Sequence, residues 1–487
     1  MAIYDELDKF QKGSITRREF LARAVALGAG TPAVLAALQG CAPAATAPAS
    51  ALSPTAAAGA AGQKLQKPGD SIDKSSVPIF RGWAYSVDTV EDNTNKFNAA
   101  YGENVNYKTI TGDYISIIEN MHINNQPLDM AYSNPATMNR WRVPGWIHDM
   151  EGFWDIDKAR AEMYDGVRES LSIDGKLCGL PYFVSNRGCV HANNILLEKV
   201  GITPAEYPKT YEEMYDQARR IQKDGAADSP LLAHWFSSGI WFGVSWGYLF
   251  ECLNRGAVLF DDKNDNEAVF DEKSLSILNE LKKMYEEKLV PEGIFTMGET
   301  DFIDAFCTGK YAYSQQQTYD NKVFNDPAKS VIAGKCSLVP AQGQSWGLID
   351  EGVYVMPNRK QDDASLARQM RLTGFFGYRD HKEELFVAKR WAIENALNSG
   401  YKAVLEDPDV IAAYKVWSPD AKHIDTMNGL LAVAPFPKVW QAFWWEEFNT
   451  ALSRDVQAAV LGQKPVKEAH EGLKKIAQDL KAQYAAS

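Results

Sequence analysis

The sequence contains little histidine and little cysteine, and neither residue is clustered. Its 7 histidines are scattered, its 6 cysteines form no Cys-x-x-Cys, and there is no His-Glu-x-x-His and no Walker loop. These absences argue against the common zinc-hydrolase and nucleotide-binding sites and against an iron–sulfur cluster. We therefore expect no metal, no cofactor and no catalytic residues.

The chain also lacks a basic patch. Its net charge is -12 with acidic and basic residues interspersed, which argues against nucleic acid as a partner. A length of 487 residues, with 45% hydrophobic and 23% charged residues, is typical of a globular protein with two lobes. After the N-terminal segment no apolar run reaches the roughly 18 residues that a membrane span needs.

Residues 1–41 have the pattern of an export signal. Arg17 and Arg18 precede Phe-Leu and a weakly apolar stretch that runs to Leu38. The paired arginines resemble a twin-arginine (Tat) signal, which exports folded proteins; an ordinary secretory signal is the alternative.

The signal ends in Leu38-Gln39-Gly40-Cys41, which looks like a lipobox whose cysteine is diacylated. Two acyl chains anchor a protein stably to a membrane. Residues 42–76 are almost all small or polar and are expected to form a disordered tether. The alternative is cleavage at a small-residue site near Ala42–Ala44. We expect the mature protein on the outer face of the cytoplasmic membrane.

Five cysteines remain after Cys41, and an odd number leaves at least one free thiol. Cys178 and Cys189 flank a predicted strand crossing and are the pair that we expect to form a disulfide.

The mature chain begins with a strand–helix–strand–helix–strand rhythm. Apolar or alternating segments at 77–86, 104–110 and 128–133 predict strands, and helical periodicity predicts helices between them. This order is the mark of an α/β fold with a mainly parallel sheet.

Ligands of such sheets bind outside the carboxyl ends of the strands. That rule places Trp83, Tyr85 and Asp88 at one ligand edge, and Ser133 and Asn134 at another. Asp88 has an alternative role as the cap of the following helix.

The second half of the chain has similar sequence signals for helices. Thr210-Tyr211-Glu212-Glu213 is a capping box that predicts a helix through Arg220. Residues 275–285 predict an amphipathic helix, and 456–484 predict a helical tail that is interrupted near Gly462.

Several motifs, in order, resemble the bacterial extracellular solute-binding proteins of the maltose-binding type over about residues 78–484. They include Asp174–Tyr182 (DGKLCGLPY), Leu197–Gly201 (LEKVG), Pro208–Glu213 (PKTYEE) and Phe306–Ala312 (FCTGKYA). The resemblance implies a two-lobed α/β periplasmic-binding-protein fold (type II) with the ligand between the lobes.

On this basis we expect lobe I at 77–185 plus 345–395 and lobe II at 190–340 plus 400–487. The chain would cross between them near 180–191, 338–353 and 388–402, and closure about these hinges would bury the ligand. The resemblance also implies a monomer that delivers its ligand to the transmembrane permease subunits of an ABC importer.

The resemblance places stacking aromatic residues at Tyr319, at Trp444 and at Trp241 or Trp246, and it adds Tyr182 from the first lobe or the hinge. Planar rings with fixed polar groups around them suit a sugar, which is the ligand that we expect. A polyamine is the alternative ligand, and it would need unpaired carboxylates in the cleft. An anion would need Arg81, Arg140 or Arg187 facing inward.

An enzyme is the remote alternative. Gly243-Val244-Ser245-Trp246-Gly247 matches the Gly-x-Ser-x-Gly elbow of exported α/β-hydrolases, with His423 or His470 downstream. The bulky segment before it does not alternate like a strand, and no His-Gly oxyanion motif precedes it.

Overall fold

The computed structural model describes residues 77–236, 243–359 and 362–485. The expected signal, its Arg17, Arg18 and Cys41, and the tether lie outside these residues, as does Trp241. No helix in the described part of the chain is long and apolar enough to cross a membrane.

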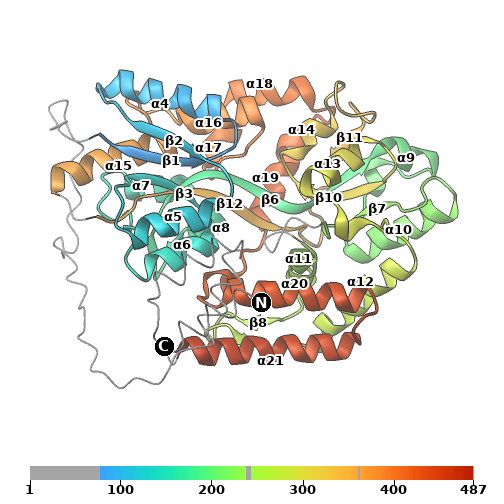
Figure 1. Ribbon diagram of the computed structural model, residues 1–487. Coiled ribbons are helices and arrows are strands. Elements are labelled where there is room, and N and C mark those ends of the chain that lie inside the picture. The colour runs from blue at the N-terminus through green and yellow to red at the C-terminus, as the bar shows by residue number, and fades with distance from the viewer. Residues whose placement is uncertain (1–76, 237–242, 360–361, 486–487) are drawn as a thin grey trace, which may run out of the picture. The chain divides into compact units, whose positions relative to one another are not determined.

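The first half forms the expected alternation of strands and helices (Figure 1). Strand β1 (Ile79–Trp83), helix α4 (Val87–Tyr101), strand β2 (Asn106–Ile110), helix α5 (Tyr114–Ile123) and strand β3 (Met130–Ser133) follow in order. β1 pairs in parallel with both β2 and β3, and Ile79 to Trp83 align with Asn106 to Ile110. The sequence prediction of strands, helices and parallel pairing is confirmed for this part.

The start of α4 differs from the sequence prediction. Ser86, not Asp88, is the N-cap residue, with φ 42° and ψ 52°, and Asp88 lies exposed in the first turn. The left-handed backbone at Ser86 starts the helix two residues earlier than a cap at Asp88 would. A carboxylate in the first turn still interacts favourably with the helix dipole.

One long strand connects two parts of the sheet. The strand order is β2-β1-β3-β12-β6-β10-β7, and β11 (Cys336–Leu338) also pairs with β6. Along β6 (Leu180–Asn193), Leu180 to Arg187 pair with β12 (Leu348–Val355), and Arg187 to Ala192 pair with β10 (Tyr313–Gln317). β7 (Leu231–Leu232) completes the sheet. β6 and β12 therefore run side by side at the middle of the sheet (Figure 1).

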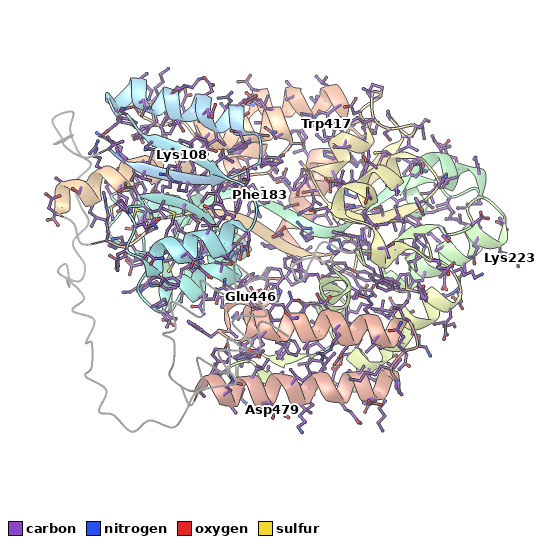
Figure 2. The ribbon with its side chains drawn as sticks, viewed as in Figure 1. Lys108, Phe183, Lys223, Trp417, Glu446 and Asp479 are labelled. Atoms are coloured by element: carbon purple, nitrogen blue, oxygen red, sulfur yellow. The ribbon has the colours of Figure 1, made fainter. Side chains whose placement is uncertain are left out.

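Helices cover both parts of the sheet. Beside the first strands lie α6 (Pro135–Arg142), α7 (Ile156–Glu162), α8 (Asp165–Ser170), α15 (Asp363–Gly377) and α16 (Phe386–Asn395). Beside the later strands lie α9 (Asn194–Lys199), α10 (Tyr211–Lys223), α13 (Glu299–Cys307), α14 (Asp320–Phe324) and α19 (His423–Val433). In Figure 2, Phe183 lies between these two parts, whereas Lys223 is at the outer edge.

A helical layer packs below the later strands (Figure 1). It contains α11 (Val244–Asn254), α12 (Glu272–Glu286), α20 (Trp445–Val460) and α21 (Val466–Ala485), which contact one another. The described residues also form α17 (Lys402–Leu405), α18 (Pro408–Trp417) and the 3-10 turns η1 (Pro204–Glu206), η2 (Ile294–Thr296) and η3 (Lys438–Gln441). The break between α20 and α21 confirms the predicted interruption near Gly462.

The helix cap at Thr210 forms as the sequence predicts, but Glu213 accepts from the N–H of Lys209 and not from the Thr210 N–H that a capping box requires. Thr210 Oγ1 accepts from the Glu213 N–H at 3.2 Å, and Glu213 Oε2 accepts from the Lys209 N–H at 2.7 Å. The first of these bonds satisfies an N–H group in the first turn of α10 that has no partner within the helix.

The expected disulfide between Cys178 and Cys189 is wrong. Both thiols are buried and free, and Cys178 Sγ contacts Lys176 O whereas Cys189 Sγ contacts Gln316 O. Cys178 precedes β6, and Cys189 lies nine residues beyond its first residue, Leu180. An extended strand rises about 3.3 Å per residue, so the two Cα atoms are far beyond the roughly 7 Å limit for a disulfide.

Candidate functional site

A cavity of about 480 Å³ lies where the strand ends of the first part face the later strands and helices. Its lining comes from segments far apart in the sequence: Trp83, Ala84, Tyr85, Gly112, Asp113, Tyr114, Ile115, Asn134, Pro135, Ala136, Tyr182, Phe183, Arg187, Trp246, Tyr319, Asp350, Glu351, Leu397 and Trp440. The segments after β1, β2 and β3 all contribute, in keeping with the rule that ligands bind beyond the carboxyl ends of parallel strands. The volume is in the range of small-molecule sites.

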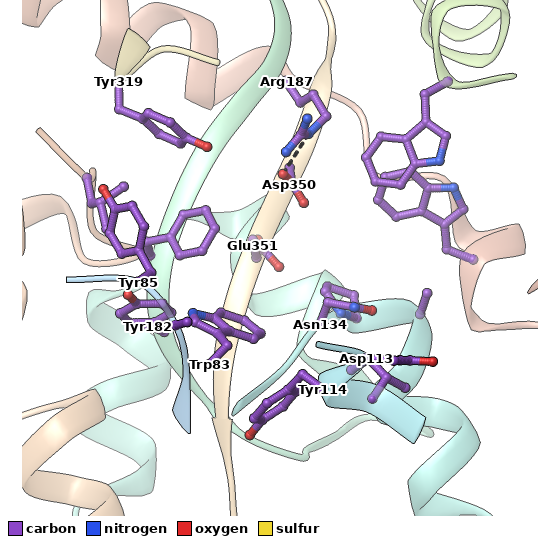
Figure 3. A pocket seen from close by; sticks show the side chains of 18 of the residues that line it. Trp83, Tyr85, Asp113, Tyr114, Asn134, Tyr182, Arg187, Tyr319, Asp350 and Glu351 are labelled. Atoms are coloured by element: carbon purple, nitrogen blue, oxygen red, sulfur yellow. Dashed lines mark hydrogen bonds and ion pairs between the residues drawn. The ribbon is translucent and has the colours of Figure 1, made fainter. Parts of the chain in front are cut away.

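One wall of the cavity is aromatic, with Trp83 and Tyr182 among the rings that line it (Figure 3). The Trp83 ring stacks on Tyr132 with centroids 4.6 Å apart, and Tyr132 stacks on Tyr182 at 4.8 Å. Tyr114 holds this arrangement in place because its hydroxyl donates to Arg81 O and accepts from the Tyr132 N–H, each at 2.8 Å. The wall therefore presents flat faces that are fixed before any ligand arrives.

A second aromatic group comes from the helical layer. The rings of Trp246, on α11, and Trp440, on η3, lie with centroids 4.4 Å apart and planes inclined by 30°. The guanidinium carbon of Arg187 lies 5.6 Å from the Trp246 centroid, within the range of a cation–π contact. The cavity thus has aromatic surfaces on two sides.

The polar group between them is a buried ion pair. Arg187 Nε donates to Asp350 Oδ2 at 2.8 Å, and Arg187 Nη1 lies 3.3 Å from Glu299 Oε1. Gln317 Nε2 also donates to Asp350 Oδ2 at 2.9 Å. Burial opposes the charged form of Arg187, but the negative charges of Asp350 and Glu299 raise its pKa above the ordinary value. The guanidinium stays charged and its charge is balanced locally.

Two further carboxyl groups near the cavity are deeply buried. Glu351 is 2% exposed, and burial raises the pKa of its carboxyl well above the ordinary value. Asp320, next to Tyr319, is 3% exposed, and burial, with a smaller contribution from the charge of Glu299, raises its pKa to about 8. Burial therefore favours the neutral form of both carboxyl groups.

Two helices begin at the cavity. Asp113 caps α5 and accepts from the Ser116 N–H at 3.2 Å, and Asn134 caps α6 and accepts from the Thr137 N–H at 2.9 Å. These bonds hold the two cap residues at the cavity, where Figure 3 labels both among its lining side chains.

The structure brings together six of the residues expected at the site from sequence. They are Trp83, Tyr85, Asn134, Tyr182, Trp246 and Tyr319. Three others lie outside the cavity. Asp88 is exposed on α4, Ser133 is fully buried with its hydroxyl directed to Asn134 O, and Trp444 packs against Phe260 and Phe448.

Trp444 lies outside the cavity because its side chain packs in the core of the helical layer. It is the N-cap residue of α20, and its side chain is 6% exposed within the core of the helical layer. Trp440, four residues earlier on η3, lines the cavity instead. A run of several aromatic residues does not reveal which ring faces the ligand.

Sequence reasoning also missed Asp350 and Glu351. They interrupt the apolar segment Leu348–Val355, every residue of which is buried. Two adjacent carboxylates in an otherwise apolar strand are costly to bury, and that signal was available in the sequence.

The hydrolase elbow is not formed around Ser245. Ser245 lies in the first turn of α11, is fully buried, and its Oγ has no hydrogen-bond partner among the described residues. His470 Nε2 is instead 2.7 Å from Ser274 Oγ. An activated nucleophile needs a base within hydrogen-bond reach and access to substrate, and Ser245 lacks both in the described part of the chain.

The residues that the structure describes contain no group of three or more histidine, cysteine, aspartate or glutamate side chains placed to hold a metal ion. The cavity is thus lined by aromatic rings and hydrogen-bonding groups, an arrangement suited to holding a small polar molecule.

Comparison with known proteins points to binding. The model of the family described as bacterial extracellular solute-binding protein matches residues 83–369. An uncharacterized ABC transporter extracellular-binding protein of Pyrococcus horikoshii is 21% identical over 298 residues, which cover 59% of this chain and 63% of that relative. The match therefore spans less than two thirds of the relative's length.

Solved structures share the fold over most of the chain. Maltose-bound MalE3 of T. maritima has a TM-score of 0.67 and 18% identity, with 84% of this chain and 100% of that chain covered. A solute-binding protein of Agrobacterium radiobacter K84 in complex with ribitol has a TM-score of 0.66 and 14% identity, covering 84% and 99%. These similarities confirm the predicted two-lobed α/β fold.

Proposed function

This chain belongs to the bacterial extracellular solute-binding protein family, and from that premise we propose that it captures a neutral sugar or polyol for an ABC importer. The observation that carries the proposal is the cavity with aromatic faces on two sides and a charge-balanced Arg187–Asp350 pair between them. Aromatic faces receive the C–H face of a sugar ring, and the polar groups receive its hydroxyls. The structural relatives bound to maltose and ribitol support this ligand class.

The charges at the cavity favour a neutral ligand over a polyamine. A polyamine needs carboxylates that are free to pair with ammonium groups. Asp350 is already paired with Arg187. Burial raises the pKa of Glu351, which favours its neutral form.

The charges also disfavour an anion. Arg187 is the arginine that lines the cavity, and it is held by two carboxylates. Arg81 donates to Asn106 O and Arg140 pairs with Glu119, both away from the cavity lining.

The experiment is a thermal-shift screen of the mature protein, followed by calorimetric titration of each compound that raises the unfolding temperature. The panel contains maltose, ribitol, mannitol, putrescine and spermidine. A ligand that binds only the folded state stabilises it by mass action, so a compound at 100 times its Kd adds about 2.7 kcal/mol. Stabilisation by a diamine or triamine and by none of the hydroxylated compounds would contradict the proposal.

We further propose that the lobes comprise 77–185 plus 345–395 and 190–340 plus 400–487, and that they close around the ligand. β6 and β12 are continuous across the middle of the sheet and are suited to serve as hinge strands. The closed form would then be presented by a monomer to the permease subunits in the membrane. No catalytic step is part of this function.

We propose that the protein reaches the outer face of the cytoplasmic membrane by Tat export and stays there through lipid on Cys41. The support is the paired Arg17 and Arg18 before an apolar stretch and the lipobox that ends at Cys41. The small and polar residues 42–76 would then serve as the tether.

A further inference from the structure

Glu351 has an arrangement of hydrogen bonds that one protonation state explains better than the other. Its carboxyl lines the cavity, its Oε2 contacts Ser170 Oγ, and its Oε1 is buried without a partner among the described residues. In Figure 3 it lies between the Arg187–Asp350 pair and Asn134. A buried oxygen without a partner on the wall of a ligand cavity requires an explanation.

The contacts of the Ser170 hydroxyl indicate which protonation state Glu351 has. Ser170 Oγ is 2.8 Å from Val167 O, a carbonyl that can only accept, and it also contacts Glu351 Oε2. A serine hydroxyl has one hydrogen to donate. Both contacts are satisfied together when Ser170 donates to Val167 O and Glu351 donates its own proton from Oε2 to Ser170 Oγ.

The charges around Glu351 agree with this state. Asp350, on the same strand, is the ionisable group whose charge acts on Glu351, and it repels a second negative charge. Arg187, on β6, is already engaged by Asp350 and by Glu299 of α13, so its charge is balanced. From α8 the partner is the uncharged Ser170. No cation in the described part of the chain forms an ion pair with Glu351.

We infer that Glu351 is held as a neutral carboxylic acid and that its free Oε1 accepts a hydrogen bond from a ligand hydroxyl, which selects uncharged hydroxylated ligands over amines. This inference rests on the proposed function for the ligand, whereas the protonation state is a property of the protein alone. An ammonium group at this position would require Glu351 to lose its proton to form an ion pair.

Infrared difference spectroscopy tests the protonation state without any ligand. The spectrum of the wild-type protein minus that of E351Q at pH 7 should contain the carbonyl stretch of a protonated acid. Carboxylate bands in its place would overturn the inference. S170A provides a matched variant, since loss of the Ser170 contact should shift that carbonyl stretch.

Ligand titration tests the selection. E351L should weaken binding of the hydroxylated ligand about tenfold, because one hydrogen bond to a buried acceptor is lost. For the wild type, calorimetry in two buffers of different ionisation enthalpy should detect no proton release with that ligand. Unchanged affinity in E351L, or an amine that binds while the infrared acid band turns into carboxylate bands, would overturn it.

A wrong ligand class would give a result that differs from that of a wrong protonation state of Glu351. If no sugar, polyol or amine binds while the acid band is present, the proposed ligand class is wrong and the protonated state of Glu351 stands.

Discussion

Arg187 Nε on β6 donates to Asp350 Oδ2 on β12 across 2.8 Å, and this bond joins the two strands that run through the middle of the sheet. The side chains are 5% and 12% exposed, so the pair is shielded from water and from salt. The same two residues line the cavity, which connects the candidate site to the central strands.

Removing one partner of this pair should be costly. D350N leaves the Arg187 charge buried with Glu299 as its remaining counter-charge at 3.3 Å, so we expect a loss of about 3 kcal/mol in the free energy of unfolding. Chemical denaturation measures this loss. The double variant R187M/D350L should recover part of it, because no buried charge is left unpaired. A D350N protein as stable as the wild type would show that Arg187 is not dependent on Asp350.

The aromatic wall should contribute directly to ligand affinity. W83A removes the ring that stacks on Tyr132 at 4.6 Å and lines the cavity, and we expect about tenfold weaker binding by calorimetric titration. W444F is the matched control, because Trp444 packs in the helical layer outside the cavity. It should lower the unfolding temperature without changing Kd. Equal losses of affinity in the two variants would contradict this assignment of the wall.

These residues illustrate what the sequence could predict about the site. The carboxyl-end rule correctly brought Trp83, Tyr85 and Asn134 to the cavity, because parallel β1 and β3 end at the same edge. It could not distinguish Ser133 from Asn134, since one residue of register decides which side chain faces inward. Trp440 lies on η3 and Trp444 is the N-cap residue of α20, and only the packing of these two segments determines which ring lines the cavity.

The fold was more predictable than the site for a physical reason. The periodicities of 2 and 3.6 residues are repeated along each element, so β1, α4 and β2 are indicated by many residues together. The positions of Asp350 and Glu351 depend instead on the pairing of β12 with β6. Ser185 on β6 pairs with Asp350 on β12, and the two residues are about 165 positions apart in the sequence. Local patterns carry no record of such long-range pairing.

The cysteines should be insensitive to reductant. Cys178, Cys189, Cys252, Cys307 and Cys336 are all buried and free. We therefore expect the unfolding temperature to be the same with and without dithiothreitol. Alkylation after denaturation without reductant, read by mass spectrometry, should label all five thiols. A pair that is labelled only after reduction would reveal a disulfide that the structure does not contain.

Cell fractionation should separate the two parts of the export proposal. R17K/R18K should leave the precursor in the cytoplasm, because the Tat machinery reads the paired arginines. C41S should still be exported but should be lost from the membrane fraction, since no acyl chain remains to anchor it. Normal membrane attachment of C41S would show that another segment holds the protein, and normal export of R17K/R18K would indicate an ordinary secretory signal.

Asp320 should make the protein less stable at alkaline pH. Burial raises the pKa of its carboxyl in the folded state to about 8, whereas the unfolded chain has the ordinary value near 3.9. A raised pKa means that the folded state holds its proton more tightly, so this stabilisation is fully present below about pH 4 and is lost as pH rises through about 8. D320N keeps an oxygen that can accept from the Gln317 N–H but cannot ionise. Its unfolding temperature should therefore exceed that of the wild type more at pH 9 than at pH 5. If the difference between the two proteins is the same at both pH values, Asp320 does not titrate in this range, and the charged form is accommodated without cost.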